Sequence, residues 1–207
     1  MTQSSRYQDA ARALLRDTLL DVAGELLEEA PWAEVTMITI AAKAGVSRQT
    51  LYKEFGTREE FAQAYVLREA ERFIDSVEAE LARSPGNVTE AVRSSFRLFL
   101  EEIQRNPLVT NLALRDDGSD ELFSLFTTRG GPVVQLAKTR LSEKFIELWP
   151  AISRKHANLL SSLLVRLAIS HAGLPEGTAE QAADNVVEVV EPFLLAAQPI
   201  PHDRGTV

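Results

Sequence analysis

The chain has 207 residues, of which 45% are hydrophobic and 25% are charged, a composition typical of a globular protein and not of a disordered or fibrous one. It contains no cysteine, which excludes disulfide frameworks, thiolate metal sites and cysteine nucleophiles and fits a reducing compartment. The net charge of -8, taken alone, argues against a nucleic-acid partner.

Neither export nor membrane insertion is expected. The first twenty residues carry charged side chains every few positions and lack the continuous apolar core of a signal peptide. The most apolar later run, residues 159–174, is interrupted by Arg166 and His171 and is too short to cross a bilayer core of about 30 Å as a helix. The sequence therefore favours a cytoplasmic protein.

Turn and capping residues divide the N-terminal part into helices. A long amphipathic helix ends before a proline, and Gly45 separates two short segments that Thr36 and Ser47 can cap at their N-termini. Thr57 with Glu60 forms a capping box for another long helix. The expected helices cover residues 7–29, 36–44, 47–54 and 57–82.

The C-terminal part follows the same pattern with larger units. Helices are expected at residues 88–105, 109–115, 120–145, 151–172 and 178–197, followed by a frayed tail at 198–207. The run Gly130-Gly131-Pro132 is expected to interrupt or kink the third of these helices. No stretch shows convincing strand alternation, so the sequence predicts an all-α fold.

The net charge conceals a small basic region. Residues 36–58 hold four basic side chains, Lys43, Arg48, Lys53 and Arg58, and one acidic side chain, Glu54, which gives a local charge of +3. The remainder of the chain then carries -11, since the whole chain carries -8. A basic region on an acidic body is compatible with DNA binding.

The two short helices around Gly45 form the pattern of a helix-turn-helix, in which the second helix enters the major groove of DNA. Gly45 can adopt the left-handed backbone that the turn needs. The residues expected to pack between the helices are Ile40, Ala41, Ala44, Val46, Leu51 and Phe55. The residues left to point outward are Arg48, Gln49, Thr50, Tyr52 and Lys53.

The outward residues are of the types that DNA recognition uses. Arginine can donate two hydrogen bonds to guanine, glutamine can pair with adenine, and threonine can contact a thymine methyl group. Tyr52 and Lys53 suit phosphate oxygens, and Arg58 adds a cation near free backbone N–H groups in the first turn of the next helix. An ordinary solvated basic surface is the alternative for any one of these residues.

The segment TMITIAAKAGVSRQTLYKEFGTREEF, residues 36–61, resembles the DNA-binding signature of the TetR family of bacterial transcriptional regulators. The resemblance implies an N-terminal three-helix helix-turn-helix DNA-binding domain over residues 1–56, a C-terminal helical ligand-binding and dimerisation domain over residues 57–197, and a flexible tail over residues 198–207. It implies phosphate contacts from Thr36, Tyr52 and Arg58 and base contacts from Arg48, Gln49 and Thr50, with Lys53 in either role. Ser47, the expected cap of the second helix, belongs to the same DNA-binding set.

Two residues depart from the family pattern. Glu54 stands where many members have a neutral or basic side chain, and an acid beside phosphate would repel it. Either Glu54 turns away, or it reads a cytosine amino group, or the affinity for DNA is modest. Arg58 stands where lysine is usual, which keeps the charge.

Two other classes of function have less support. An enzyme needs a catalytic or metal-binding constellation, but His156, His171 and His202 are separated in sequence and no carboxylate cluster accompanies them. Ser170 adjoins His171, but neighbours on a helix do not face each other. A helical scaffold would leave the outward residues of the second short helix without a role. No metal or other cofactor is therefore expected.

An aromatic and aliphatic set in the middle helices is the candidate lining of a ligand cavity. Its members are Phe96, Phe99, Leu100, Ile103, Phe123 and Phe126. Plain core packing is the alternative, because every helical domain needs such a stripe. The resemblance implies a cavity among these helices, and the lining favours a largely apolar effector such as an acyl chain. The candidate polar anchors are Asn111, Arg115, Asp116 and Arg140.

The resemblance also implies a homodimer formed through the last two helices. Each shows a broad apolar face. The first consists of Leu159, Leu160, Leu163, Leu164 and Leu167, and the second of Ala182, Val186, Val189, Val190 and Phe193. The sequence thus predicts a homodimeric transcriptional regulator, most simply a repressor, that leaves a palindromic operator when it binds a small molecule.

Overall fold

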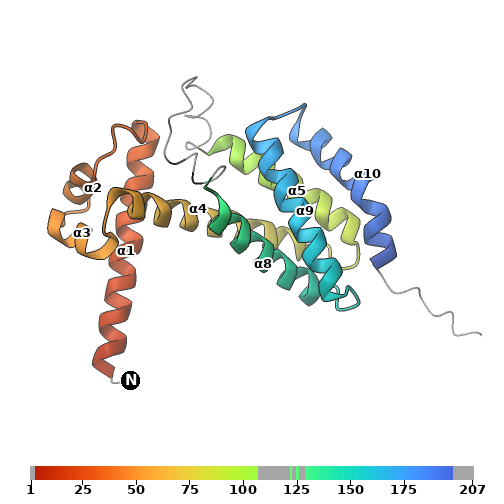
Figure 1. Cartoon of the computed structure of the whole chain (residues 1–207), viewed down its shortest axis with the longest axis horizontal. Helices are drawn as coiled ribbons and strands as arrows, with labels where there is room; N and C mark the ends of the chain where they lie inside the picture. The colour runs from red at the N-terminus through yellow and green to blue at the C-terminus, as the bar shows by residue number, and fades with distance from the viewer. Residues whose placement is uncertain (1–2, 107–121, 123–124, 126–128, 198–207) are drawn as a thin grey trace, which may run out of the picture. The chain divides into compact units, whose positions relative to one another are not determined.

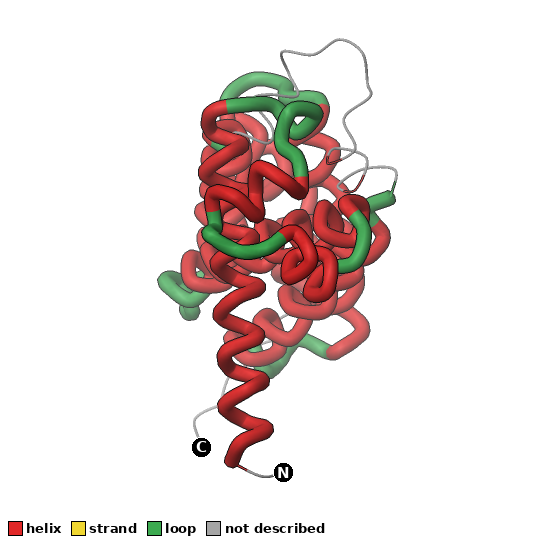
Figure 2. Tube along the Cα trace, turned by 90° about the vertical axis from the view of Figure 1, so that its left-hand side faces the viewer, coloured by secondary structure: helices red, strands yellow, loops and turns green. Residues whose placement is uncertain are grey.

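Eight α-helices make up the described part of the chain, which covers residues 3–106, 122, 125 and 129–197 of the computed structural model (Figure 1). These residues include no strand, so the predicted all-α class is confirmed. The helices are α1 (Gln3–Glu29), α2 (Met37–Lys43), α3 (Arg48–Phe55), α4 (Arg58–Leu81), α5 (Val88–Arg105), α8 (Gly131–Leu148), α9 (Arg154–Gly173) and α10 (Ala179–Ala197). Figure 2 shows the loops that join them.

Local capping sets the N-termini of α2, α3 and α4. Thr36 Oγ1 accepts a hydrogen bond from the Thr39 backbone N–H at 3.1 Å. Thr57 and Glu60 satisfy each other reciprocally: the Thr57 backbone N–H donates to Glu60 Oε2 at 2.7 Å, and the Glu60 N–H donates to Thr57 Oγ1 at 3.1 Å. Ser47 caps α3 in the same way. Each cap satisfies an N–H group that has no partner inside its helix, which confirms the predicted starts.

The run Gly130-Gly131-Pro132 marks a helix start, because α8 begins at Gly131. Pro132 fits the first turn, where a backbone N–H would have no intrahelical partner. The helix predicted at residues 109–115 and most of the segment 120–130 lie outside the described residues, as does the predicted tail at 198–207.

The described residues form two compact units. One contains the residues up to Glu69 and those described between Asn106 and Gly130, and the other contains Ala70–Arg105 and the residues from Gly131 onward. Helix α4 contributes to both units, because the division falls between Glu69 and Ala70. The predicted domain boundary before residue 57 stays a prediction.

The first unit packs α1, α2 and α3 around one apolar core. Trp32 lies parallel to Phe61, with ring centroids 6.5 Å apart. Burying a large apolar side chain contributes about 1.5–3 kcal/mol. The fully buried members are Leu19, Ala23, Ile40, Leu51, Phe61 and Ala62.

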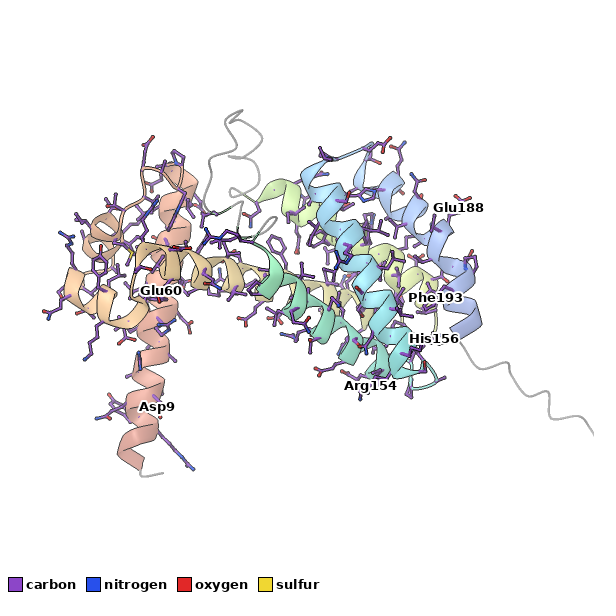
Figure 3. The ribbon with its side chains drawn as sticks, viewed as in Figure 1. Asp9, Glu60, Arg154, His156, Glu188 and Phe193 are labelled. Atoms are coloured by element: carbon purple, nitrogen blue, oxygen red, sulfur yellow. The ribbon has the colours of Figure 1, made fainter. Side chains whose placement is uncertain are left out.

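The second unit packs α5 against α10 and α8 against α9. Its largest fully buried side chains are Leu81, Val88, Val92, Phe145, Leu160 and Leu194. Helices α9 and α10 also meet where the His156 ring packs edge-on against Phe193, with centroids 5.3 Å apart (Figure 3). This histidine therefore has a packing role.

Candidate nucleic-acid interface

The turn between α2 and α3 is held by backbone geometry. The Val46 N–H donates to the Ala41 carbonyl at 3.0 Å, and the Gly45 N–H donates to Ala42 at 3.2 Å. Gly45 has φ of 69°, in the left-handed region, and a Cβ atom added there would meet nothing within 4 Å. Glycine is therefore favoured at this position by its backbone conformation and not by lack of space.

One side of the helix-turn-helix is buried, as the sequence predicted. Ile40 and Leu51 are fully buried, Ala41 and Phe55 nearly so. Phe55 packs edge-on against Phe61, with centroids 4.7 Å apart. Ala44 and Val46 are only half-buried. This packing fixes which side of α3 can face outward.

Four predicted DNA-contacting side chains share the outer side of α3. Arg48, Gln49 and Lys53 are exposed, and Tyr52 is 43% exposed. No described carboxylate pairs with Arg48 or Lys53. Basic and amide groups therefore stand together on one helix surface, available to an external partner.

Thr50, Ser47 and Thr36 are engaged in capping. Thr50 is half-buried and its Oγ1 lies 2.8 Å from Ser47 Oγ, while its backbone N–H donates to that same Ser47 oxygen at 3.0 Å. Thr36 is exposed at the N-terminus of α2 and pairs reciprocally with Thr39. The structure thus gives all three a local role in addition to the predicted DNA contacts.

Arg58 also has a structural role that the sequence did not reveal. Its guanidinium lies over the Trp32 ring, 4.5 Å from the centroid, and donates to the backbone carbonyls of Trp32 at 2.6 Å and Val35 at 3.3 Å. These contacts tie the start of α4 to the connection between α1 and α2. Lys43, the remaining basic residue of the basic region at residues 36–58, pairs with Glu25 and Glu29 of α1.

Glu54 turns toward α1, which agrees with the first of the three predicted alternatives. Its Oε2 accepts a hydrogen bond from Arg12 Nε at 2.7 Å, and 10% of the Glu54 side chain is exposed. Arg16 donates to the Glu54 backbone carbonyl. Neither arginine was predicted from the sequence, although their spacing of four residues places them on one face of the predicted first helix.

Of the described members of the predicted ligand lining, Phe96 and Leu100 belong to the core of the second unit and Phe99 packs against it. Phe96, Leu100 and Ile103 are buried, whereas Phe99 is half-buried. The Phe99 ring packs against Phe73 at 6.1 Å. Three members of the predicted site, Arg115, Phe123 and Phe126, lie outside the described residues, as do the candidate anchors Asn111 and Asp116.

Arg140, the remaining candidate anchor, is already paired inside the second unit. Its Nη2 lies 2.6 Å from Glu78 Oε2 and 2.8 Å from Asp75 Oδ1. The hydrogen bond to Glu78, followed by that to Asp75, holds the pKa of Arg140 above its ordinary value. Any ligand that used Arg140 would compete with two carboxylates.

Neither a membrane-spanning helix nor a metal-binding cluster occurs in the described ranges. No helix there is long and apolar enough to cross a bilayer. The same residues contain no group of three or more histidine, aspartate or glutamate side chains that could hold a metal ion.

Two family models match the chain. One, described as "Bacterial regulatory proteins, tetR family", matches residues 19–65, which include the helix-turn-helix. The other, described as "Bacterial Tetracyclin repressor, C-terminal domain", matches residues 87–192. The chain belongs to the TetR family of bacterial transcriptional regulators.

Individual TetR-family relatives agree with this assignment. The HTH-type transcriptional regulator AlkX of Mycobacterium tuberculosis is 39% identical over 187 residues, which cover 90% of this chain and 88% of the relative. The crystal structure of the TetR family repressor AlkX from a Dietzia strain has a TM-score of 0.78 at 35% identity and covers 88% of this chain and 96% of that one. The Rhodococcus erythropolis repressor QsdR, at 18% identity, TM-score 0.62, and coverage of 92% and 98%, shares the fold.

TetR-family membership decides between the classes of function that the sequence left open. The chain is a DNA-binding transcriptional regulator and not an enzyme, as predicted. TetR-family regulators bind DNA operators and act as dimers. Helix α3 occupies the position of the second helix in the helix-turn-helix, which in this class of motif reads the major groove.

The late helices expose part of their predicted apolar faces. Leu159 is 51% exposed and Leu163 is 44% exposed, whereas Leu160 and Leu164 are buried in the core of the second unit. On α10, Val189 is 73% exposed while Ala182, Val186 and Val190 are buried. Each predicted broad face therefore has one part that is buried within the second unit and one part that the second unit leaves exposed.

Proposed function

We propose that this TetR-family regulator is a ligand-responsive repressor that binds a palindromic operator in the cytoplasm as a homodimer. The observation that carries the DNA-binding part is the outer side of α3, where Arg48, Gln49, Tyr52 and Lys53 are exposed over a buried packing side. Two copies related by a two-fold axis would present two such helices, and a palindromic site would match that symmetry.

The proposed contacts divide by chemistry. Base edges are read by Arg48, Gln49 and Thr50, and phosphates are bound by Thr36, Tyr52 and Arg58, with Lys53 in either role and Ser47 holding the start of α3. Arg48 and Gln49 can each form bidentate contacts with a base. Thr50 can offer its methyl group to thymine while its hydroxyl stays bonded to Ser47.

The proposed dimer interface uses the uncovered parts of α9 and α10. Leu159, Leu163 and Val189 are large apolar side chains that the second unit leaves exposed. Covering them with a partner subunit removes apolar surface from water, which is favourable at about 25 cal/mol per Å². A four-helix arrangement from two subunits would bury both faces.

The proposed effector is a largely apolar molecule, such as an alkyl or acyl chain. Phe96, Phe99, Leu100 and Ile103 lie on one helix of the second unit and supply apolar side chains. The related Dietzia repressor is described as implicated in the biodegradation of n-alkanes, which agrees with an apolar effector. Release requires that the effector bind the DNA-incompetent state of the dimer better than the competent one. Helix α4 contributes residues to both compact units and is the proposed connection.

A titration of the operator complex tests this proposal. DNA flanking the chain's own gene would first be screened by mobility shift for specific binding. Alkanes, fatty acids, acyl-thioesters, polar drugs and sugars would then be titrated against the complex. The expected result is release by an apolar compound, and release only by a polar compound would contradict the proposed effector.

A substitution in α5 links release to the proposed lining. Leu100→Trp should reduce affinity for the releasing compound by at least about tenfold, because overpacking leaves less room for a ligand, and should leave operator affinity unchanged. Calorimetry or fluorescence would measure the ligand affinity, and thermal unfolding would verify the fold. Arg97→Trp adds the same indole at an exposed position of α5 and serves as the control. Equal ligand affinity in wild type, Leu100→Trp and Arg97→Trp would indicate that the ligand binds elsewhere in the protein.

A further inference from the structure

The acidic side chain of α3 is paired with the N-terminal helix. Glu54 Oε2 and Arg12 Nε are 2.7 Å apart, and little of the Glu54 side chain is exposed. The pKa of Arg12 is raised, through the hydrogen bond to Glu54 first and the charge attraction second. The two opposite charges cancel, so the paired glutamate adds no net negative charge to the region around α3.

Arg16, one turn further along α1, holds the backbone of the same residue. Its guanidinium carbon lies 4.0 Å from the Phe55 ring centroid, and its Nη1 donates to the Glu54 backbone carbonyl. That carbonyl belongs to the last turn of α3, where no later helical N–H can satisfy it. A cation at this end also complements the helix dipole. Arg16 thus fixes the end of α3 in the position from which Glu54 reaches Arg12.

Both arginines precede the segment that the TetR-family model matches, which begins at residue 19. Figure 1 shows α1 continuing toward the N-terminus past α2 and α3, and Figure 3 labels Asp9 on this extension. The acid on α3 and the base that neutralises it therefore come from different parts of the chain. The pairing is a feature of this chain's extended first helix.

We infer that Arg12 is a positioning residue for operator binding, which holds and neutralises Glu54 so that α3 can approach phosphate. The inference deepens the proposed function and rests on α3 being the reading helix. If Arg12 is removed, Glu54 keeps its negative charge without this partner, directly beside Lys53 in the sequence. An unpaired carboxylate near DNA phosphates repels them and opposes the contribution of the neighbouring lysine.

Direct contact of Arg12 with phosphate is the competing role. The two roles differ in how the effect of Arg12 depends on Glu54. If Arg12 acts through Glu54, removing the glutamate charge makes Arg12 dispensable. If Arg12 binds phosphate, Glu54→Gln releases it for that contact, and the loss caused by Arg12→Ala persists or grows.

A double-mutant cycle separates these roles. Wild type, Arg12→Ala, Glu54→Gln and the double variant would be compared by fluorescence anisotropy at one salt concentration, on a duplex that wild type selects from a random-sequence pool. Arg12→Ala should weaken binding about fivefold, the upper range for an exposed ion pair, and Glu54→Gln should change it less than about twofold. The double variant should match Glu54→Gln. Arg6→Ala, at an exposed arginine of the same helix, should leave the affinity unchanged.

The outcomes distinguish this inference from the proposed function. An additive cycle, or an equal loss in Arg6→Ala, overturns the positioning role of Arg12. Thermal unfolding shows whether Arg12→Ala folds. If it does not, the exchanged pair Arg12→Glu/Glu54→Arg restores opposite charges and should bind the operator at least as tightly as wild type. Clearly weaker operator binding by this folded variant overturns the inference. A wild-type protein that selects no sequence contradicts the proposed function itself. If wild type binds the duplex, Lys53→Ala weakens that binding and the cycle is additive, the proposed function is retained and only the role of Arg12 is excluded.

Discussion

The outer side of α3 and the uncovered side of α9 both expose side chains, but of opposite chemistry. On α3 these are Arg48, Gln49 and Lys53, which carry charge or hydrogen-bonding groups. On α9 they include the large apolar side chains of Leu159 and Leu163, which carry neither. The polar side chains on α3 can form hydrogen bonds and ion pairs with DNA phosphates and base edges, whereas the leucines on α9 are suited to packing against a second apolar surface. One chain can therefore present two surfaces to two classes of partner, and its net charge of -8 describes neither surface.

The largest expected effect comes from placing a charge on the α9 surface. Leu163→Glu should abolish dimerisation and weaken operator binding about 100-fold or more, because a monomer holds one half-site and loses the gain from the second. Analytical ultracentrifugation and anisotropy would measure the two effects. Leu174→Glu alters another exposed leucine, just beyond the end of α9, and should change neither. A monomeric Leu163→Glu variant with full operator affinity would contradict the link between the surfaces.

A smaller and more selective effect is expected on α3. Arg48→Ala or Gln49→Ala should cost about 1–3 kcal/mol at the base that the side chain reads, the range for a good bidentate contact. The dimer should remain intact. Affinities for a panel of single-base operator variants would show relaxed preference at particular positions. A uniform loss across the panel would instead assign these residues to phosphate.

The smallest expected effect is a change in salt dependence. Lys53→Ala should weaken binding similarly across sequences and should lower the slope of log affinity against log salt by about one, the value for one lost phosphate contact. Arg140→Ala removes a cation that Glu78 and Asp75 already neutralise, and it should leave the slope unchanged. If wild type and Lys53→Ala show the same salt dependence of affinity, Lys53 does not contact phosphate.

The helix-turn-helix could be predicted from sequence because its determinants are local. Thr36, Ser47 and Gly45 act on residues within a few positions, through caps and one left-handed turn. The partner of Glu54 could not be predicted, since Arg12 lies 42 residues earlier and only the tertiary fold of the first unit brings the two together. The contact between Arg58 and Trp32, 26 residues apart, is of the same kind.

The late helices show a different limit of sequence reasoning. Periodicity predicted one broad apolar face on α9, but Leu160 and Leu164 are buried while Leu159 and Leu163 are exposed. Helical spacing reports which residues share a face, and it does not report how much of that face the rest of the chain covers. The ligand lining has the same ambiguity, because a buried phenylalanine such as Phe96 serves a core and a cavity wall equally well.

In the proposed mechanism, the outer side of α3 reads the operator. The most direct test replaces Arg48, Gln49, Tyr52 and Lys53 with alanine together, leaving the packing side of α3 and the α9 surface unchanged, and measures operator affinity and dimer fraction at one stated salt concentration. We expect a folded dimer whose affinity for the operator falls to that for an unrelated duplex. A folded dimer that keeps wild-type operator affinity would show that another part of the molecule reads the DNA.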